Sequence, residues 1–217
     1  RSREAIRPFF EWLGDARNQI EAVAMDMNSA FDLEVKAQCP NAVVVYDLFH
    51  VVAKYGREVM DRVRVDQANQ LRDDKVARKV IKSSRWILLR NADNLEPEQA
   101  VKLDELLAAN AFLTTVYVLK DQLKTLWFAE SETTARSAWR EWAGMALGSG
   151  IDALVRFAKK LEPYMEGIVS SALHRLNTSV LEGMNNRIKV IKRMAYGYRD
   201  TDYFFLKIRA AFPGKVR

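Results

Sequence analysis

A segment near the C-terminus, residues 177–199, carries residue types that suit chemistry on a phosphate. On a helix its side chains separate into two lines that lie about 100° apart. The apolar line consists of Leu181, Met184, Ile188, Ile191 and Ala195. The polar line consists of Glu182, Asn185, Asn186, Lys189 and Arg193. Helix stability does not require one carboxylate, two amides and two cations on one face, whereas a site for a divalent metal beside a phosphate backbone does.

A structural explanation of Glu182 stands beside the functional one. Residues Ser179 to Glu182 form a capping-box pattern, in which the glutamate returns a hydrogen bond to the start of its own helix. The amide and basic residues that follow Glu182 have no part in a cap. They therefore favour the functional interpretation.

Two aspartates follow apolar segments near the N-terminus. Residues 20–25 and 42–46 are typical of buried strands, they end at Asp26 and Asp47, and a helix is predicted over 28–38 between them. A strand–helix–strand order implies parallel neighbours, whose carboxyl ends collect ligands. Each aspartate also precedes a helix, so N-capping is the alternative. His50 follows Asp47 by three residues, and we expect it to orient Asp47 by a hydrogen bond, with a metal role left open.

Carboxylates at a strand end and on a helix suit two-metal phosphoryl transfer. That chemistry needs acidic groups that hold two Mg²⁺ ions about 3.5–4 Å apart. Magnesium prefers a few carboxylates together with phosphate and water oxygens. Neighbouring cations would neutralise the phosphates beside the scissile bond.

Bulk composition excludes several classes of protein. With one cysteine, Cys39, and two histidines among 217 residues, an internal disulfide or a cysteine-rich zinc site is excluded. The sequence contains no apolar run long enough to span a bilayer. Net charge is −3 over residues 1–49, +6 over 50–90, −4 over 91–172 and +7 over 173–217. The two basic blocks predict contact with a polyanion, and solvated helix faces are the alternative.

The rest of the chain reads as helices. One long or kinked helix is predicted over 48–90, with a break at 91–94 and Pro97 at a first helical position. Further helices are predicted over 2–13, where Gly14 ends the helix, and over 97–110, 112–129, 131–147, 151–172, 178–195 and 201–211, and Gly197 is predicted to supply a turn. Four tryptophans in the helical block, Trp86, Trp127, Trp139 and Trp142, are expected to pack in its core.

These motifs resemble the DDE-type transposases of bacterial insertion sequences, specifically the ISL3 family. Two of the segments that carry the resemblance are 23–27 and 44–52, which contain Asp26 and Asp47. The most specific motif is Asn177-x4-Glu182-Gly183-x-Asn185-Asn186-x-Ile188-Lys189-x2-Lys192-Arg193-x3-Gly197-Tyr198. The similarity extends across nearly the whole chain.

The resemblance implies a fold that is mostly α with a small α/β part. A ribonuclease-H-like core would occupy residues 1–49, a helical insertion 50–172, and a return to the core 173–217. Asp26 and Glu182 would be the catalytic, metal-binding acids, with Asp47, His50, Asn185 and Asn186 beside them. The DNA-contacting residues would be Arg187, Lys189, Lys192, Arg193, Tyr198 and Arg199. The implied cofactor is Mg²⁺ or Mn²⁺.

The implied partner is double-stranded DNA, at transposon ends and at the target, with a homo-oligomer assembled on it. Neither a membrane nor a small-molecule substrate is implied, and the implied location is the cytoplasm, at the nucleoid. The family's first catalytic aspartate, on an earlier strand, has no counterpart here, and its zinc-binding and helix-turn-helix region is also absent. We therefore expect an incomplete core that does not transpose DNA alone.

Two other interpretations remain open. One is a different ribonuclease-H-like nuclease, such as a junction resolvase, against which the long helical insertion and the polar run after Glu182 argue. The other is a non-catalytic, basic helical module for DNA binding or assembly, in which Asp26, Asp47 and Glu182 all cap helices. Convergence of Asp26 and Glu182, although 156 residues apart, distinguishes the transposase from this module.

Overall fold

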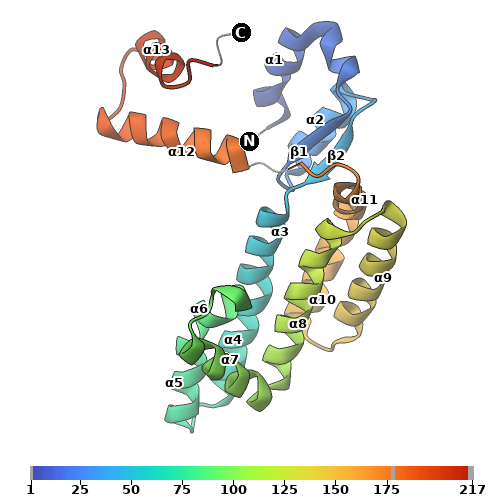
Figure 1. Ribbon diagram of the computed structural model, residues 1–217, viewed down its shortest axis with the longest axis vertical. Helices are drawn as coiled ribbons and strands as arrows, with labels where there is room; N and C mark the ends of the chain where they lie inside the picture. The colour runs from blue at the N-terminus through green and yellow to red at the C-terminus, as the bar shows by residue number, and fades with distance from the viewer. Residues whose placement is uncertain (1, 177–178, 215–217) are drawn as a thin grey trace. The chain divides into compact units, whose positions relative to one another are not determined.

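The computed structural model describes residues 2–176 and 179–214. Its contacts divide the chain into two compact units, Arg1–Leu176 and Asn177–Arg217. In the described part, helices predominate and the only sheet has two parallel strands (Figure 1). This confirms the prediction of a mostly α chain with a small α/β part. The boundaries of a core and an insertion within the chain stay a prediction.

The first unit begins with a helix, a strand, a helix and a strand. These elements are α1 (Arg3–Leu13), the 3-10 helix η1 (Gly14–Gln19), β1 (Ala22–Met25), α2 (Ser29–Gln38) and β2 (Val43–Tyr46). The strands pair in parallel, with Ala22 opposite Val43 and Met25 opposite Tyr46. The predicted strand–helix–strand unit is therefore confirmed, with strands shorter than the apolar segments suggested.

Helix α1 ends where the sequence indicates and is fixed to α2 by charge. Gly14 follows it with a φ of 53°, a conformation that glycine adopts without strain. The buried carboxylate of Glu34 on α2 accepts hydrogen bonds from Arg3 and Arg7 of α1 at 2.8 and 2.9 Å. Hydrogen bonds from Arg7, Arg3 and Gln38 lower the pKa of Glu34 to about 2. The ion pairs thus tie α1 to α2.

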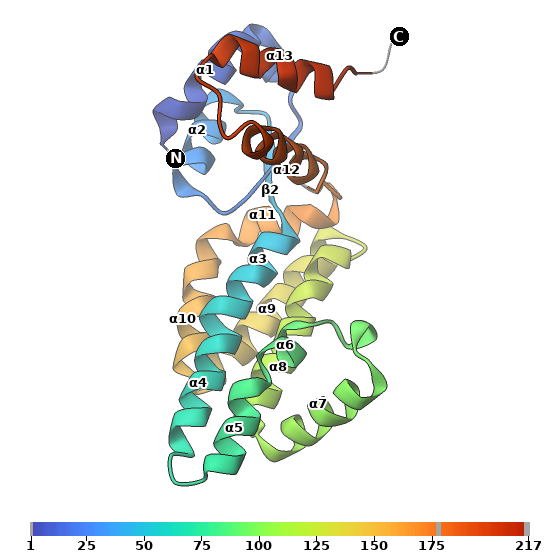
Figure 2. The same cartoon turned by 90° about the vertical axis from the view of Figure 1, so that its left-hand side faces the viewer.

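The remaining helices of the first unit follow β2. The first group is α3 (Leu48–Tyr55), the π-helix η2 (Gly56–Met60), α4 (Asp61–Gln70), α5 (Lys75–Ser83), α6 (Arg85–Leu89), η3 (Ala92–Asn94) and α7 (Pro97–Ala109). The second is α8 (Ala111–Thr125), η4 (Leu126–Phe128), α9 (Glu132–Gly148), α10 (Asp152–Leu161), η5 (Glu162–Tyr164), α11 (Met165–Val169) and η6 (Ser170–Ala172). Figures 1 and 2 show α3, α8, α9 and α10 side by side.

Buried aromatic residues join these helices. Tyr55 on α3 donates a hydrogen bond to the carbonyl oxygen of Val116 on α8 at 2.8 Å, and its ring meets Phe157 of α10 edge to face. The indole of Trp142 on α9 donates to the carbonyl oxygen of Leu119 on α8 at 2.9 Å. Each aromatic side chain therefore fills the core and satisfies its own polar atom, as buried tyrosine and tryptophan must.

One lysine is also part of this core. Lys120 on α8 is 2% exposed, and its ammonium group donates to the carbonyl oxygens of Leu88 and Arg90 at 2.9 and 3.2 Å. The ammonium also lies 4.0 Å from the ring centroid of Tyr117. Burial lowers the pKa of Lys120 to about 8. The side chain closes the C-terminal end of α6 and attaches that helix to α8.

Two predicted helices are wrong in length. The prediction of a single long or kinked helix over 48–90 fails at residues 71–74, where the chain turns back on itself between α4 and α5 (Figure 2). Asp74 caps α5 there through hydrogen bonds from the amides of Val76 and Ala77. The predicted helix over 151–172 breaks at η5, where Pro163 lacks an amide hydrogen. The sequence signals for these two breaks are Pro163 and the capping residue Asp74.

The second unit is a helical hairpin of α12 (Ser179–Met194) and α13 (Thr201–Ala211). The amide of Gly197 bonds to the carbonyl of Lys192, and that of Tyr196 to the carbonyl of Arg193, which is a Schellman ending. Tyr196 and Gly197 both have positive φ, at 50° and 101°. Asp200 caps α13 through the amide of Tyr203 at 3.0 Å. Gly197 therefore supplies the turn that the sequence predicts.

Candidate active site and nucleic-acid interface

Asp26 and Asp47 lie at the same edge of the sheet. Each directly follows the last residue of a strand, and those two residues, Met25 and Tyr46, are paired. The amide of Asp47 donates to the carbonyl oxygen of Met25 at 3.1 Å, which extends the parallel ladder by one bond. Neighbouring strands lie about 4.8 Å apart, so the two aspartates are close neighbours. The predicted placement at the carboxyl ends of parallel strands is confirmed.

The two aspartates differ in what else they do. The side chain of Asp47 is buried, and its Oδ1 accepts a hydrogen bond of 2.7 Å from the amide of Phe49, so Asp47 caps α3. The cap of α2 is Asn28, whose Oδ1 accepts from the amides of Ala30 and Phe31. The capping alternative is therefore confirmed for Asp47 and wrong for Asp26. Asp26 is half-buried and lies two residues before the cap.

His50 lies on the first turns of α3, as predicted, and its ring meets that of Phe49 edge to face at 5.6 Å. Its Nδ1 is buried and has no hydrogen-bond partner within residues 2–176 or 179–214. The predicted hydrogen bond from His50 to Asp47 stays a prediction, and it would use the other ring nitrogen.

A tryptophan that the sequence assigns only to the core holds the strand end in place. The indole nitrogen of Trp127 in η4 donates to the carbonyl oxygen of Tyr46 at 2.8 Å, within buried surroundings. Tyr46 immediately precedes Asp47, so the bond fixes the backbone beside that carboxylate. Trp127, Trp139 and Trp142 are buried as predicted, whereas Trp86 is 66% exposed, which makes its expected core position wrong.

The side chain of Tyr46 is fixed from two other sides. Its hydroxyl donates to Oδ1 of Asp32 on α2 at 2.6 Å, and its ring meets Tyr164 edge to face. Burial and the bond to Asp32 raise the pKa of Tyr46 well above its usual value. Gly167 of α11 lies against the same ring, since a β-carbon there would be 2.5 Å from Cε2 of Tyr46. Packing thus determines the position of the second strand end.

The polar line of α12 is exposed. Glu182, Asn185, Asn186, Lys189 and Arg193 all have exposed side chains. Along the apolar line Ile188 and Ile191 are half-buried, while Leu181, Met184 and Ala195 remain exposed. The whole polar line of α12 is therefore exposed, whereas the second unit by itself buries only part of the apolar line. The alternative of a capping box at Ser179 involves a side chain outside the described residues.

The predicted DNA-contacting residues are distributed over α12 and the turn after it. Arg187, Lys192 and Arg199 are exposed, and the guanidinium of Arg187 lies 5.2 Å from the ring centroid of Phe212. Lys189 reaches Oδ1 of Asn186 at 3.5 Å. Tyr198 is half-buried and stacks on Phe204 with ring centroids 4.8 Å apart. Tyr198 thus joins the two helices of the hairpin, and a DNA contact through it stays a prediction.

Within the described residues, no three side chains of His, Cys, Asp or Glu lie together as a metal-binding group. Asp26 and Asp47 nevertheless offer hard oxygen atoms at one edge, which is the chemistry that Mg²⁺ prefers. Asp26 belongs to the first unit and Glu182 to the second. Their convergence therefore stays a prediction.

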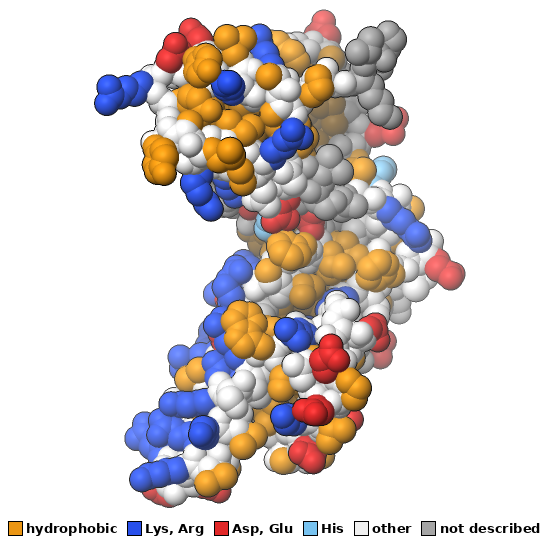
Figure 3. All heavy atoms as spheres, turned by 60° about the vertical axis from the view of Figure 1, so that its left-hand side comes forward, with side chains coloured by type: hydrophobic (Ala, Val, Ile, Leu, Met, Phe, Trp, Pro, Cys, Tyr) orange, Lys and Arg blue, Asp and Glu red, His pale blue; other side chains and the backbone are white. Residues whose placement is uncertain are grey.

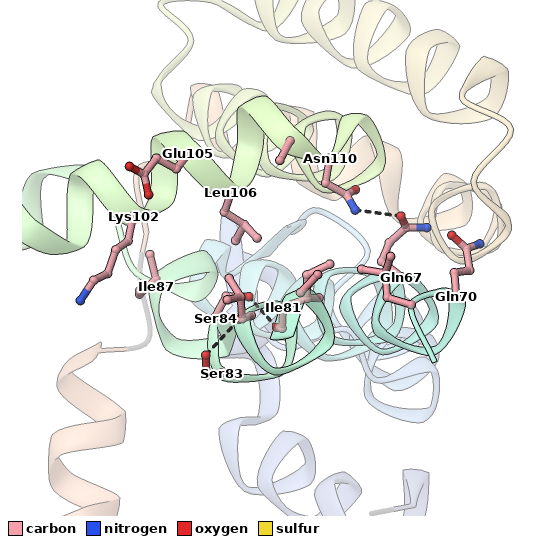
Figure 4. Close-up of a pocket in the computed structure, with 14 residues that line it drawn as sticks. Gln67, Gln70, Ile81, Ser83, Ser84, Ile87, Lys102, Glu105, Leu106 and Asn110 are labelled. Atoms are coloured by element: carbon pink, nitrogen blue, oxygen red, sulfur yellow. Dashed lines mark hydrogen bonds between the residues drawn. The ribbon is translucent and has the colours of Figure 1, made fainter. Parts of the chain in front are cut away.

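A well-formed pocket of the first unit lies elsewhere. It has a volume of about 820 Å³ and is bounded by α4, α5, α6 and α7. Figure 4 shows Gln67 and Asn110 joined across it by a hydrogen bond of 2.9 Å, with Ile81 and Leu106 among its apolar walls. No residue of the strands or of their ends lines this pocket. It therefore has no connection with the aspartates.

Comparison with known proteins assigns the family. A family model of DDE transposases of the ISL3 type, described as "Transposase", matches residues 1–208. The chain belongs to the ISL3 family of transposases. This confirms the family inferred from the three sequence segments. No solved structure matches the chain significantly.

Two curated relatives show how much of an ISL3 transposase the chain spans. It is 63% identical over its whole length to the "Transposase for insertion sequence element IS1001" of Bordetella parapertussis, and covers 54% of that protein. It is 26% identical to the "Transposase for insertion sequence element IS1557" of Mycobacterium tuberculosis, with 88% of the chain and 48% of the relative aligned. The chain thus spans about half the length of these relatives. Among the described helices, none is long and apolar enough to cross a membrane.

Proposed function

We propose that this chain is part of the catalytic region of a transposase that cuts and joins the DNA ends of its element by metal-dependent phosphoryl transfer. The observation that carries the proposal is Asp26 at the end of a parallel strand, where Asn28 and not Asp26 caps the next helix, in a chain of the ISL3 family. The two strands and their helices would form part of a ribonuclease-H-like core. The helices between β2 and α12 would then be an insertion in that core.

In this proposal Asp26 and Glu182 are the metal ligands. Asp26 is half-buried at the strand end and is not needed as a helix cap, because Asn28 has that role. Glu182 is exposed on the polar line of α12. Both present carboxylate oxygens, and Mg²⁺ or Mn²⁺ binds well to two such groups with water and phosphate completing its shell. A bound metal pair would make a water or a 3′-hydroxyl more nucleophilic and would stabilise the leaving oxygen.

The neighbouring residues have positioning roles. Asp47 is 6% exposed and caps α3, so we assign it to holding the edge rather than to binding the ion directly. Asn185 and Asn186 would donate hydrogen bonds to phosphate oxygens beside the scissile bond. Arg187, Lys189, Lys192, Arg193, Tyr198 and Arg199 would contact the DNA backbone. Double-stranded DNA is then the partner, bound by a homo-oligomer.

The competing function is a non-catalytic module for DNA binding or assembly. Capping of α3 by Asp47 favours it, because one of the three acids then has a purely structural explanation. The position of Asp26 argues against it, because this aspartate does not cap α2. The two functions differ in whether Asp26 and Glu182 share an ion.

A double-mutant cycle on Mn²⁺ affinity tests the proposal. Asp26→Asn and Glu182→Gln are each expected to weaken Mn²⁺ binding, measured by electron paramagnetic resonance. The double variant should lose much less than the sum of the two, since either substitution already breaks the shared site. Glu141→Gln, at an exposed position on α9, is the control and should bind as the parent does. Additive losses, or none, would show that no ion is shared and that the catalytic assignment is wrong.

A further inference from the structure

Helix α5 carries a face of four cations. Lys75, Arg78, Lys79 and Lys82 follow the spacing i, i+3, i+4 and i+7, which places them on one side of the helix. These four side chains alone line a shallow hollow of about 220 Å³. We refer to these four residues as the α5 basic face. Figure 3 shows Lys and Arg side chains gathered along one edge of the helical part of the first unit.

The charge of the α5 basic face is not neutralised by the protein. None of the four cations forms an ion pair in the part of the chain that the structure describes. Nε of Arg78 is buried and has no hydrogen-bond partner there. Like charges three or four residues apart repel one another along a helix. The face therefore costs α5 stability that an external polyanion would restore.

A second basic hollow in the same unit shows the opposite arrangement. Between η2, α4 and α10, three of the four cations have a carboxylate within 4 Å, and Arg57 is the exception among the described residues. The pairs are Arg62 with Asp66 at 3.0 Å, Lys160 with Glu58 at 3.2 Å and Arg156 with Asp152 at 3.9 Å. Carboxylates therefore pair with three of the four cations of that hollow, whereas none pairs with the α5 basic face within the described residues.

The α5 basic face is held in a defined orientation. Arg64 on α4 donates to the carbonyl oxygen of Lys82 at 2.8 Å and pairs with Asp61 at 2.8 Å, which attaches the end of α5 to α4. On the opposite side of α5, Ile81 is buried against the unit. The cap by Asp74 fixes the start of the helix. Because both ends of α5 are fixed, binding would not have to order the helix itself.

We propose that the α5 basic face binds the phosphate backbone of duplex DNA, as a contact surface additional to α12. The inference rests on the proposed function for the identity of the polyanion. Lys75 and Lys82 are seven residues apart, about 10 Å along the helix, which matches about three base-pair steps of one DNA strand. Lysines act as point charges on phosphates and carry no sequence information. The face therefore positions DNA along the helical part of the unit and does not select its sequence.

Removal of three exposed charges tests the inference. The variant is Lys75→Gln, Lys79→Gln and Lys82→Gln, and the matched control is Arg140→Gln, Arg156→Gln and Lys159→Gln, which removes as many exposed charges from α9 and α10. Binding of labelled duplex DNA by fluorescence anisotropy is measured over a salt series in EDTA, so that no metal takes part.

The α5 variant is expected to lose about 10-fold or more in affinity, and its salt slope should fall by about 2–3, near one unit per lost phosphate contact. The control should lose less than about threefold. Lys→Arg substitution at the same three positions should keep the affinity. Because like charges have been removed, the α5 variant should unfold at the temperature of the parent or above it.

Equal losses in the α5 variant and the control would overturn the inference, as would competition by RNA that exceeds competition by duplex DNA. Loss of DNA binding on changing α5, together with no shared ion at Asp26 and Glu182, would contradict the proposed chemistry alone. A shared ion at Asp26 and Glu182, together with unchanged DNA binding in the α5 variant, would contradict only the role of α5.

Discussion

The two units of the chain hold their polar residues in opposite ways. In the first unit, the ladder bond to Met25, the indole of Trp127 and the packing of Gly167 fix the strand end before any ligand is present. In the second unit, Glu182 and its polar neighbours are exposed on a two-helix hairpin. Preorganised carboxylates need little reorganisation to bind a metal, whereas exposed side chains must be ordered by what they bind. In the proposed site, Asp26 would therefore be positioned by folding and Glu182 by what it binds.

The largest expected effect is on metal binding at the strand end. Asp26→Asn replaces a carboxylate by a weakly ligating amide and should lower Mn²⁺ affinity by about 100-fold or more, beyond the 10–100-fold typical of residues that only support a ligand. Calorimetric Mn²⁺ titration measures the affinity. Asp15→Asn, an exposed position in η1, serves as the control, and equal affinity in both variants would refute the role of Asp26.

The packing of α11 on β2 gives the next effect. Gly167→Ala places a methyl group within 3 Å of the Tyr46 ring and the Val44 carbonyl oxygen, and should destabilise the first unit by about 1–3 kcal/mol. Gly144→Ala, inside α9 with open space around it, should stabilise by about 0.5–1 kcal/mol because alanine favours helix. Urea unfolding of both variants measures the difference. Equal stabilities would mean that α11 is not tightly packed on β2.

Substitution of two buried tryptophans distinguishes an effect on stability from an effect on the proposed metal site. Trp127→Phe and Trp142→Phe each leave a buried carbonyl oxygen without its donor and should cost about 1–3 kcal/mol. Only Trp127 bonds to the residue before Asp47, so only its substitution should also weaken Mn²⁺ binding, by about threefold to tenfold. Affinity is measured at a temperature where both variants are folded. A similar loss of affinity in Trp142→Phe would remove the positioning role of Trp127.

The smallest effect concerns the second unit. Tyr196 has a φ of 50° and a fully exposed side chain, so Tyr196→Gly relieves strain without removing a contact. Amide hydrogen exchange should slow over the last turns of α12, by about threefold to fivefold for a gain of up to about 1 kcal/mol. Exchange in the first unit should be unchanged. Faster exchange in α12 would indicate that the tyrosine ring stabilises the hairpin.

The sequence was sufficient for features that depend on neighbouring residues. Asp26 and Asp47 were placed correctly at parallel strand ends, because apolar runs broken by aspartate and joined by one helix allow few other arrangements. Gly14 and Gly197 were assigned correctly as turns, because positive φ favours glycine. The specific motif around Glu182 led to the correct family.

Features set by distant contacts could not be predicted. The bond from Trp127 to Tyr46 joins residues 81 positions apart, and no local pattern indicates it. The turn at 71–74 was missed because helix-forming residues flank it, so its only signal was Asp74. The turn places the charges of α4 and α5 on separate helices. The net charge of residues 50–90 did not indicate this, because the turn lies inside that block.

The most direct test of the account is a crystal structure of the chain after a Mn²⁺ soak, with an anomalous map to locate the ion. The account predicts one peak within bonding distance of carboxylate oxygens from both Asp26 and Glu182. If the two carboxylates lie far apart, with Glu182 bonded to the start of its own helix, the catalytic assignment is contradicted. The non-catalytic DNA-binding module would then be the better explanation of this chain.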